Sequence, residues 1–515
     1  MKNGFHQGLQ RHDPMTTAPT NAFLAPTRGI FRCITTAAVL CAVLDMAGAA
    51  QPAQAASLSA GPMAGHRDAR STIIWLQGDA GAKAQVEYWP EDASAGTSAG
   101  AGAGARATLG QRKRSAPVAL VKADDFTAHL TLTGLQPGTR YRYRVLLDGK
   151  EARLPHAQSP AEMPSFSTEM LWQWRKHSFI PAQGHTPPDF TVAFGSCAYA
   201  NQPPYDRSLA PTGKAYGGDP GIFASIAAKK PDVMLWLGDT LYLREADYSS
   251  PSGMASRWRF DRAQPPLQSL LRTGNHYAIW DDHDFGPNDS NASFIYKDAS
   301  LRLFKRYWAN GAGGLPETPG IFRNVSLNDV DFFLLDGRFY RDADAALALP
   351  GKSLFGTAQL RWLKNALLAS TSRFKVIVAG NQLLKEVPPR IEGWSHFPEE
   401  RREFLDWLSV NRVNGIVFLS GDRHHTELNK QERHGAYPLY DFTCSPLTAG
   451  VHAPSRNEDM SRADPGTVVN QHNFCTLDFS GSWGERRLTM KSFDAAGREL
   501  WQREIGAGDL MHARE

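Results

Sequence analysis

The chain has 515 residues, a length that predicts two or three domains. Its apolar share of 42% and charged share of 21% are typical of a folded protein with a substantial core. The formal net charge is only +4, and the sequence contains no dense block of Lys and Arg. This balance excludes a basic nucleic-acid-binding stripe and a basic membrane-surface patch, so we expect no specific nucleic-acid binding.

The first 55 residues have the pattern of an export signal. Two arginines precede an apolar run over residues 33–44, and small residues follow it, with Ala53-Gln54-Ala55 as a small-x-small cleavage site. The rival interpretation is a retained anchor, but the run stops at Asp45 and is shorter than the roughly 20 apolar residues that a span needs. We predict a cleaved signal peptide over residues 1–55, a periplasmic or secreted protein, and no stable membrane span.

Removal of this segment leaves three cysteines, Cys197, Cys444 and Cys475. An odd number in an exported protein indicates at least one cysteine with a role other than a disulfide. A Cys444–Cys475 bridge would leave Cys197 free, although the sequence alone does not establish that pairing.

Residues 57–170 have the pattern of a small fibronectin-like β-sandwich. Strand-like stretches lie at residues 72–76, 84–88, 118–121 and 127–132. After a Pro137-Gly138 turn, the alternation through Tyr141 and Tyr143 resembles the sandwich corner at which a Tyr hydroxyl bonds back to the backbone. Residues 92–106 are almost all Ala, Gly and Ser and predict a mobile loop. The segment has no polar constellation, so we interpret it as a structural or interaction module.

From about residue 180 onward, strands alternate with helices, which predicts an α/β domain over residues 180–505. Its apolar runs are typical of strands buried on both faces. The predicted strands cover residues 191–194, 233–237, 278–280, 330–335, 374–379 and 416–419. The predicted helices cover residues 222–230 and the periodic stretches around Leu363 and Phe404, and residues 488–505 predict a closing hairpin.

Five polar motifs follow apolar strands of this domain. They are Gly195-Ser196-Cys197, Gly238-Asp239 with Tyr242, Asp281-Asp282-His283-Asp284 with Asn288, Asp336-Gly337-Arg338, and Gly421-Asp422-Arg423-His424-His425. Open α/β sheets place their active sites at the carboxyl ends of parallel strands. We therefore expect these motifs to converge on one site.

The donor types in these motifs indicate two kinds of cation. A thiolate from Cys197 and a phenolate from Tyr242 suit a strongly acidic ion such as Fe³⁺. The simpler alternative makes both residues buried packing groups. The crowded carboxylates from Asp281 to Asp284 repel one another unless a cation neutralises them, and the Asn288 amide oxygen suits a hard divalent ion.

The remaining motif residues predict how a bound ester would be handled. Asp422 and His424 are expected to converge on ions held by Asp239, and His283 is expected to protonate a leaving group. Arg338, held by Asp336, and Arg341 are expected to bind an anion, although either arginine, and Arg341 in particular, suits a surface ion pair as well. Two metal ions bridged by one carboxylate form a clamp for in-line displacement at phosphorus.

With these motifs the chain resembles the PhoD-type alkaline phosphatases and phosphodiesterases of the metallophosphoesterase superfamily. The resemblance also includes Asp336 to Arg341, Leu354 to Leu363 and Ser420 to His424. It implies a fold of class α/β, an αββα four-layer metallophosphatase domain that follows the small sandwich. By this similarity Fe³⁺ is held by Cys197, Asp239, Tyr242 and His424, and Ca²⁺ or another divalent ion by Asp239, Asn288 and Asp422. Catalytic roles at the phosphate and leaving group are implied for Asp282, His283, Arg338 and Arg341.

The function expected from the sequence is an exported, metal-dependent hydrolase of phosphate monoesters or diesters, acting by attack of a metal-activated hydroxide on a small-molecule or polymer substrate. Such enzymes commonly carry twin-arginine signals, whereas this leader contains no Arg-Arg pair. Two alternatives stay open: a phospholipid or cell-wall phosphate hydrolase on the same frame, and a cell-surface binding module.

Overall fold

The computed structural model describes residues 56–91, 112–157, 163–170, 187–204, 206, 208–209, 213–347 and 349–513. The predicted signal peptide over residues 1–55 and the predicted loop over residues 92–106 lie outside these ranges. The described residues, from Ala56 to Ala513, form one compact unit. None of the helices in the described ranges combines the length and the apolarity that a bilayer span requires.

The larger sheet has nine strands. In spatial order they are β23 (Glu499–Gly506), β22 (Arg487–Asp494), β21 (Asn473–Ser480), β10 (Phe190–Gly195), β13 (Val233–Leu237), β14 (Asn275–Ile279), β1 (Leu58–Arg67), β2 (Ser71–Gly78) and β6 (Thr127–Thr133). Strands β10, β13 and β14 are parallel, with Val192 opposite Val233 and Val233 opposite Asn275. Their carboxyl ends therefore meet at one edge. The predicted closing hairpin is confirmed as β22 and β23.

The second sheet has six strands. Their order is β15 (Arg323–Leu327), β16 (Val330–Leu334), β17 (Phe374–Val378), β18 (Ile416–Ser420), β20 (Ala436–Thr443) and β19 (Glu427–Arg433). Strands β16, β17, β18 and β20 are parallel neighbours. The two sheets pack face to face through aromatic pairs such as Phe194–Phe442 and Phe374–Phe479, with ring centroids 5.0 and 5.6 Å apart. The Cys444–Cys475 disulfide forms between β21 and the end of β20, which settles the pairing that the sequence left open.

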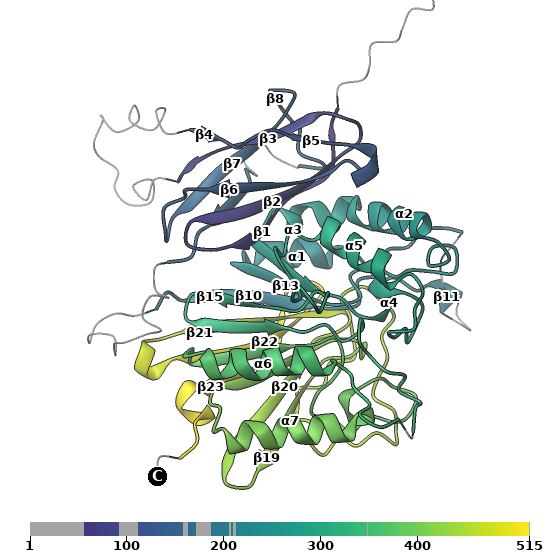
Figure 1. Cartoon of the computed structure of the whole chain (residues 1–515), viewed down its shortest axis with the longest axis vertical. Helices are drawn as coiled ribbons and strands as arrows, with labels where there is room; N and C mark the ends of the chain where they lie inside the picture. Colours follow the sequence, from purple (N-terminus) through teal and green to yellow (C-terminus); the bar gives the residue numbers. More distant parts are fainter. Residues whose placement is uncertain are drawn as a thin grey trace, which may run out of the picture. The chain divides into compact units, whose positions relative to one another are not determined.

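Helices lie on the outer faces of this pair of sheets (Figure 1). One group comprises α1 (Ile222–Ala228), α2 (Pro251–Arg262), α3 (Gln268–Leu271), α4 (Asp282–Phe285) and α5 (Lys297–Tyr307), and the other comprises α6 (Thr357–Ala369) and α7 (Pro398–Val410). Helix α7 begins with Pro398 and carries Glu399 and Glu400 in its first turn, both favourable at a helix N-terminus. The result is the expected αββα arrangement, and a short hairpin of β11 (Ser208–Leu209) and β12 (Lys214–Ala215) adds to it.

A third sheet completes the N-terminal sandwich. It contains β4 (Lys113–Arg114), β3 (Lys83–Pro90), β7 (Arg140–Leu147) and β8 (Lys150–Glu151), with β5 (Val118–Ala119) on β3 and β9 (Ser165–Ser167) on β7. Its core includes Val86 and Tyr143 packed with Ile74 and Leu130. The predicted corner is confirmed, because the backbone N–H of Gln136 donates to the Tyr141 hydroxyl at 2.9 Å.

Strand β1, which the sequence did not predict, joins the sandwich to the larger sheet. It pairs with β2 on one side and runs parallel to β14 on the other, with Ala64 opposite Asn275. The Asn275 amide donates to the Gly65 carbonyl at 2.7 Å across this junction. The division between residues 57–170 and 180–505 stays a prediction, since one sheet runs through both segments.

Candidate functional site

The polar motifs meet where the two sheets present the carboxyl ends of their parallel strands. Cys197 follows β10, Asp239 follows β13 and Asp281 follows β14, while Arg338 follows β16 and Asp422 follows β18. Side-chain atoms of these residues fall into two overlapping groups. Cys197, Asp239 and His424 form one, and Asp281, Asp282, Glu392 and Asp422 form the other. They overlap through a linking set of Asp239, Asp282 and His283, and the ligand atoms within each set lie within 4.8 Å of one another.

Four of the predicted ligands have a strained backbone. The φ angles of Cys197, Asp239, Asp422 and His424 are 61°, 50°, 66° and 56°. These values lie in the left-handed region, which side-chain-bearing residues rarely adopt. Such residues cluster at active sites when the surrounding structure over-determines them. Their coincidence at the ends of β10, β13 and β18 singles out this edge as the candidate site.

The first group joins a thiol, a carboxyl, a phenol and an imidazole. The Cys197 Sγ atom lies 3.8 Å from Asp239 Oδ2, and the Tyr242 hydroxyl lies 3.1 Å from His424 Nε2. His424 Nδ1 is hydrogen-bonded to the Gly450 carbonyl, which assigns its proton to Nδ1 and leaves Nε2 facing Tyr242 as an acceptor. The Ser445 hydroxyl donates to Cys197 Sγ at 3.1 Å. The imidazole is therefore oriented as metal-binding histidines are.

The environment of this group opposes its charged forms. Burial, and after it the Asp239 and Asp422 carboxylates, raises the pKa of the Cys197 thiol well above its usual range. Burial also raises the pKa of the Tyr242 phenol and, together with Asp282 and Asp281, that of Asp239. Because thiolate and phenolate are disfavoured without a compensating charge, these donors suit a cation that displaces their protons.

The second group surrounds the buried Arg338 guanidinium. Arg338 Nε donates to Asp281 Oδ1 at 2.6 Å, and Nη1 donates to Glu392 Oε1 at 2.8 Å. Asp336, predicted to hold Arg338 in place, accepts the backbone N–H of Arg338 at 3.0 Å and leaves the guanidinium to other carboxyls. The Asp336 carboxyl also accepts the Trp280 indole N–H at 2.8 Å and further backbone N–H groups.

The carboxyls of this group have different electrostatic settings. Burial raises the pKa of Asp422 to about 7, and the nearby Glu392 and Asp282 carboxylates add to the effect. Asp282 is also buried, but His283 and Arg338 hold its pKa at about 2. Its Oδ1 atom accepts no hydrogen bond from any described residue. A buried anionic oxygen without a hydrogen-bond partner fits a cation site.

His283 lies between the two groups. Its Nε2 atom is 3.8 Å from Asp282 Oδ2, and its ring centroid is 4.2 Å from that of Tyr242. Its backbone N–H donates to Asp239 Oδ1 at 3.2 Å, so the short helix α4 is tied to the β13 motif. Asp284, the last carboxyl of the cluster, has a structural role, since it accepts both the N–H and the hydroxyl of Thr240.

Two predicted site residues differ in their burial. The Asn288 side chain is exposed, and within the described residues no hydrogen bond joins its amide to the other predicted ligands. The next residue, Asp289, donates its N–H to Asp282 Oδ2 at 2.8 Å, which keeps this loop beside the site. Arg341 is buried: Nη1 donates to Asn381 at 2.8 Å and Nη2 lies 3.1 Å from Glu392 Oε1, so it is no surface ion pair.

Glu392 and Asn381 were not found from the sequence. Asn381 follows β17 in the segment Ala379-Gly380-Asn381, so the rule that located the other motifs applies to it as well. Its amide lies 3.2 Å from Asp281 Oδ2. Glu392 lies in a loop without a preceding strand, and no local pattern marks it.

The buried donor set at the meeting of two sheets, in an αββα frame, defines the metallophosphoesterase class. The PhoD-like phosphatase family model matches residues 196–493, and a domain of unknown function (DUF7800) matches residues 55–166. The chain belongs to the PhoD-like phosphatase family.

Individual relatives agree with this assignment. Alkaline phosphatase D of Bacillus subtilis (strain 168) is 23% identical over 392 residues, which cover 65% of this chain and 60% of that protein. The solved structure of PhoD aligns with a TM-score of 0.65 and 16% identity, over 88% of this chain and 93% of that one. Purple acid phosphatase PPD1 from yellow lupin (Lupinus luteus) aligns with a TM-score of 0.56 and 10% identity, over 86% and 74% of the two chains. The two structures show a shared fold.

Proposed function

We propose that the chain is an exported phosphoesterase that depends on two metal ions. Cys197, Asp239, Tyr242 and His424 would hold Fe³⁺, and Asp239, Asn288 and Asp422 would hold Ca²⁺ or another divalent ion. The observation that supports this most is the convergence of the thiol, carboxyl and imidazole of Cys197, Asp239 and His424 within 4.8 Å. Thiolate and imidazole suit a softer or more acidic ion, whereas carboxylate and amide oxygens suit a hard one.

The residues fit such ions on three grounds: the crowding of buried carboxyls, the Asp282 oxygen without a hydrogen-bond donor, and the fixed His424 tautomer. When bound, the two cations would supply the Lewis acidity that activates water and neutralises an anionic ester. Glu392 adds another carboxylate beside Asp422, and its charge is balanced by Arg338 and Arg341.

The chain's own residues would complete the reaction. His283 would donate a proton to the leaving oxygen, with Asp282 orienting the imidazole through the contact at 3.8 Å. The Arg338 and Arg341 guanidinium groups would stabilise the anionic ester at short range. They would act through their positive charge and not through bidentate hydrogen bonds to the ester, because carboxylates and Asn381 already accept hydrogen bonds from their N–H groups.

The first experiment combines metal analysis with a substrate comparison. Purified full-length protein is assayed for iron and calcium, and its rates on p-nitrophenyl phosphate and bis-p-nitrophenyl phosphate are compared. We expect both metals and hydrolysis of at least one ester. Metal-replete protein that hydrolyses neither ester would refute the function.

Variants test the ligand assignment separately. Cys197→Ala should lose iron, visible colour and most activity, whereas Asn288→Ala should mainly weaken the dependence on calcium. Full iron content in Cys197→Ala would refute the thiolate role. For export, a mature N-terminus near residue 56 in protein recovered outside the cytoplasm would support the predicted signal peptide, and an uncleaved cytoplasmic chain would contradict it.

A further inference from the structure

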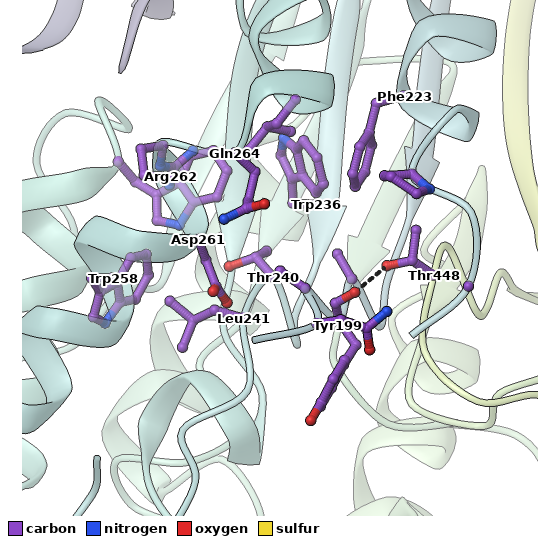
Figure 2. Close-up of a pocket in the computed structure, with 17 residues that line it drawn as sticks. Tyr199, Phe223, Trp236, Thr240, Leu241, Trp258, Asp261, Arg262, Gln264 and Thr448 are labelled. Carbon is purple, nitrogen blue, oxygen red and sulfur yellow. Dashed lines mark hydrogen bonds between the residues drawn. The ribbon is translucent and has the colours of Figure 1, made fainter. Parts of the chain in front are cut away.

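A cavity lies beside the metal-ligand motifs and is used by no step of the proposed reaction. It has a volume of about 180 Å³. Figure 2 shows Arg262 and Asp261 of α2 on one side of it, and Trp236 of β13 with Phe223 of α1 on the other. Trp258 and Trp308 add two more indoles to its lining. Aromatic rings therefore form a substantial part of its walls, beside small and polar residues.

Arg262 is the most informative residue of this lining. Its side chain is buried, and no carboxylate pairs with it within the described ranges. Instead, the guanidinium carbon lies 4.0 Å from the ring centroid of Trp308 and 5.3 Å from that of Trp75. Buried arginines are ordinarily paired with an anion. An aromatic-stacked guanidinium with no carboxylate partner at the edge of a cavity is arranged for an anionic ligand.

Other polar groups around the cavity are also incompletely satisfied. The indole N–H groups of Trp258 and Trp308 and the Asp261 Oδ2 atom are buried, and none of them has a hydrogen-bond partner among the described residues. Thr448 differs, because its hydroxyl donates to the Tyr199 carbonyl at 3.0 Å, the bond drawn in Figure 2. Buried polar atoms are normally paired, so several exceptions around one cavity call for an explanation. Two indole donors and a guanidinium favour an anion. The Asp261 carboxyl opposes an anion only when it is ionised, and burial raises its pKa to about 7.

We propose that this cavity is a binding site for a monocyclic aromatic carboxylate. Its ring would lie against the indole walls, and its carboxylate would accept hydrogen bonds from Arg262. The size agrees, since a cavity of about 150 Å³ is sufficient for benzene. The proposed binding site is separate from the proposed reaction. Ala198 and Leu241 line the cavity, whereas the adjacent residues Cys197 and Tyr242 belong to the candidate metal site.

Isothermal titration calorimetry of the full-length protein with sodium benzoate tests this site, with benzamide as the uncharged analogue. We expect saturable binding of benzoate and at least about tenfold weaker binding of benzamide, which lacks the anionic partner for Arg262. Arg262→Lys keeps the charge but loses the planar fork, so we expect its affinity for benzoate to fall by about tenfold or more. The matched control is Arg259→Lys on the same helix, whose partner is Asp125 outside the cavity.

A variant that fills the cavity tests the site without a loss of folding. Leu267 lines the cavity and is partly buried, so Leu267→Trp should abolish benzoate binding while the thermal unfolding temperature stays close to that of the wild type. The proposal is overturned if benzoate shows no saturable binding, if benzamide binds equally well, or if folded Leu267→Trp keeps wild-type affinity. These measurements do not involve phosphoester turnover, so their failure is distinct from failure of the proposed function.

Discussion

Gly380 and Asp281 touch so closely that any side chain on Gly380 would displace the carboxyl. A Cβ atom there would stand 2.5 Å from Asp281 Cγ and 2.6 Å from Oδ1. Asp281 is the carboxylate that receives Arg338 Nε, and Arg338 also holds Glu392. A backbone position at the end of β17 thus fixes the geometry of a carboxylate that follows β14 in the other sheet.

Gly380→Ala should therefore lower kcat/KM by about tenfold or more, since a displaced Asp281 would misplace the Arg338 guanidinium and a shift of about 1 Å is costly. The matched control is Gly337→Ala, because a Cβ at Gly337 would meet nothing within 4 Å. Both variants are compared in p-nitrophenyl phosphate hydrolysis and in thermal unfolding. Equal activity of folded Gly380→Ala and Gly337→Ala would show that the position of Asp281 does not matter.

Arg338 should matter for stability as well as for activity. Arg338→Ala would leave Asp281 and Glu392 buried without their cation, and breaking a buried pair in this way costs about 3–5 kcal/mol of the free energy of unfolding. Urea denaturation measures the change. Arg487→Ala, which removes an exposed ion pair with Glu504, should leave the unfolding midpoint almost unchanged. Similar midpoints for the two variants would contradict a central role for the buried pair.

The Cys444–Cys475 disulfide joins residues separated by 31 positions and ties β20 to β21. Chain-entropy reasoning gives about 3–4 kcal/mol for a loop of this length. The double variant Cys444→Ala/Cys475→Ala should lose that amount of unfolding free energy and so unfold at a lower urea concentration. When folded, it should retain metal and activity. Cys197 is left unchanged in this variant, because its thiol is free and belongs to the candidate metal site, not to the disulfide. An unchanged unfolding midpoint would show that the bridge adds no stability.

Most of the site was predictable because its residues obey one rule. Cys197, Asp239 and Asp422 each come directly after an apolar strand and a Gly or Ser, and parallel strands bring such ends together. Glu392 was not predicted by this rule, because it lies in a loop between β17 and α7 and reaches the site only through tertiary packing. Its partnership with Arg338 depends on the path of that loop, which no local pattern encodes.

The fold was predictable to a similar extent. Strands with continuous apolar runs, such as β13 and β18, were located well. Strand β1 was missed because it contains Gly61, Pro62 and Gly65, all poor strand residues. Tertiary packing explains one of them: a Cβ at Gly65 would stand 2.3 Å from Ala309 Cβ, so the close approach requires glycine. Strand β14 begins earlier than predicted because Asn275 and His276, although polar, are buried within it.

The site carboxyls give the metal-free protein a distinctive dependence on pH. Burial, together with Glu392 and Asp282, raises the pKa of Asp422 from its ordinary 3.8 to about 7. The folded state then binds more protons than the unfolded state between these values, so this contribution to stability is complete below 3.8 and is lost as pH rises through about 7. Chelator-treated protein should therefore unfold at a lower temperature at pH 7 than at pH 5.

Cations should reverse this trend, because they replace the protons and bind better as the carboxyls ionise. Adding Ca²⁺ should accordingly raise the unfolding temperature more at pH 7 than at pH 5. Asp422→Asn should flatten the metal-free profile between pH 4 and 7, whereas Glu504→Gln at an exposed position should not. Scanning calorimetry across this range measures both effects, with chelated protein for the metal-free profile and with added Ca²⁺ for the metal-bound one. A metal-free profile that Asp422→Asn leaves as steep as before would show that Asp422 does not titrate in this window.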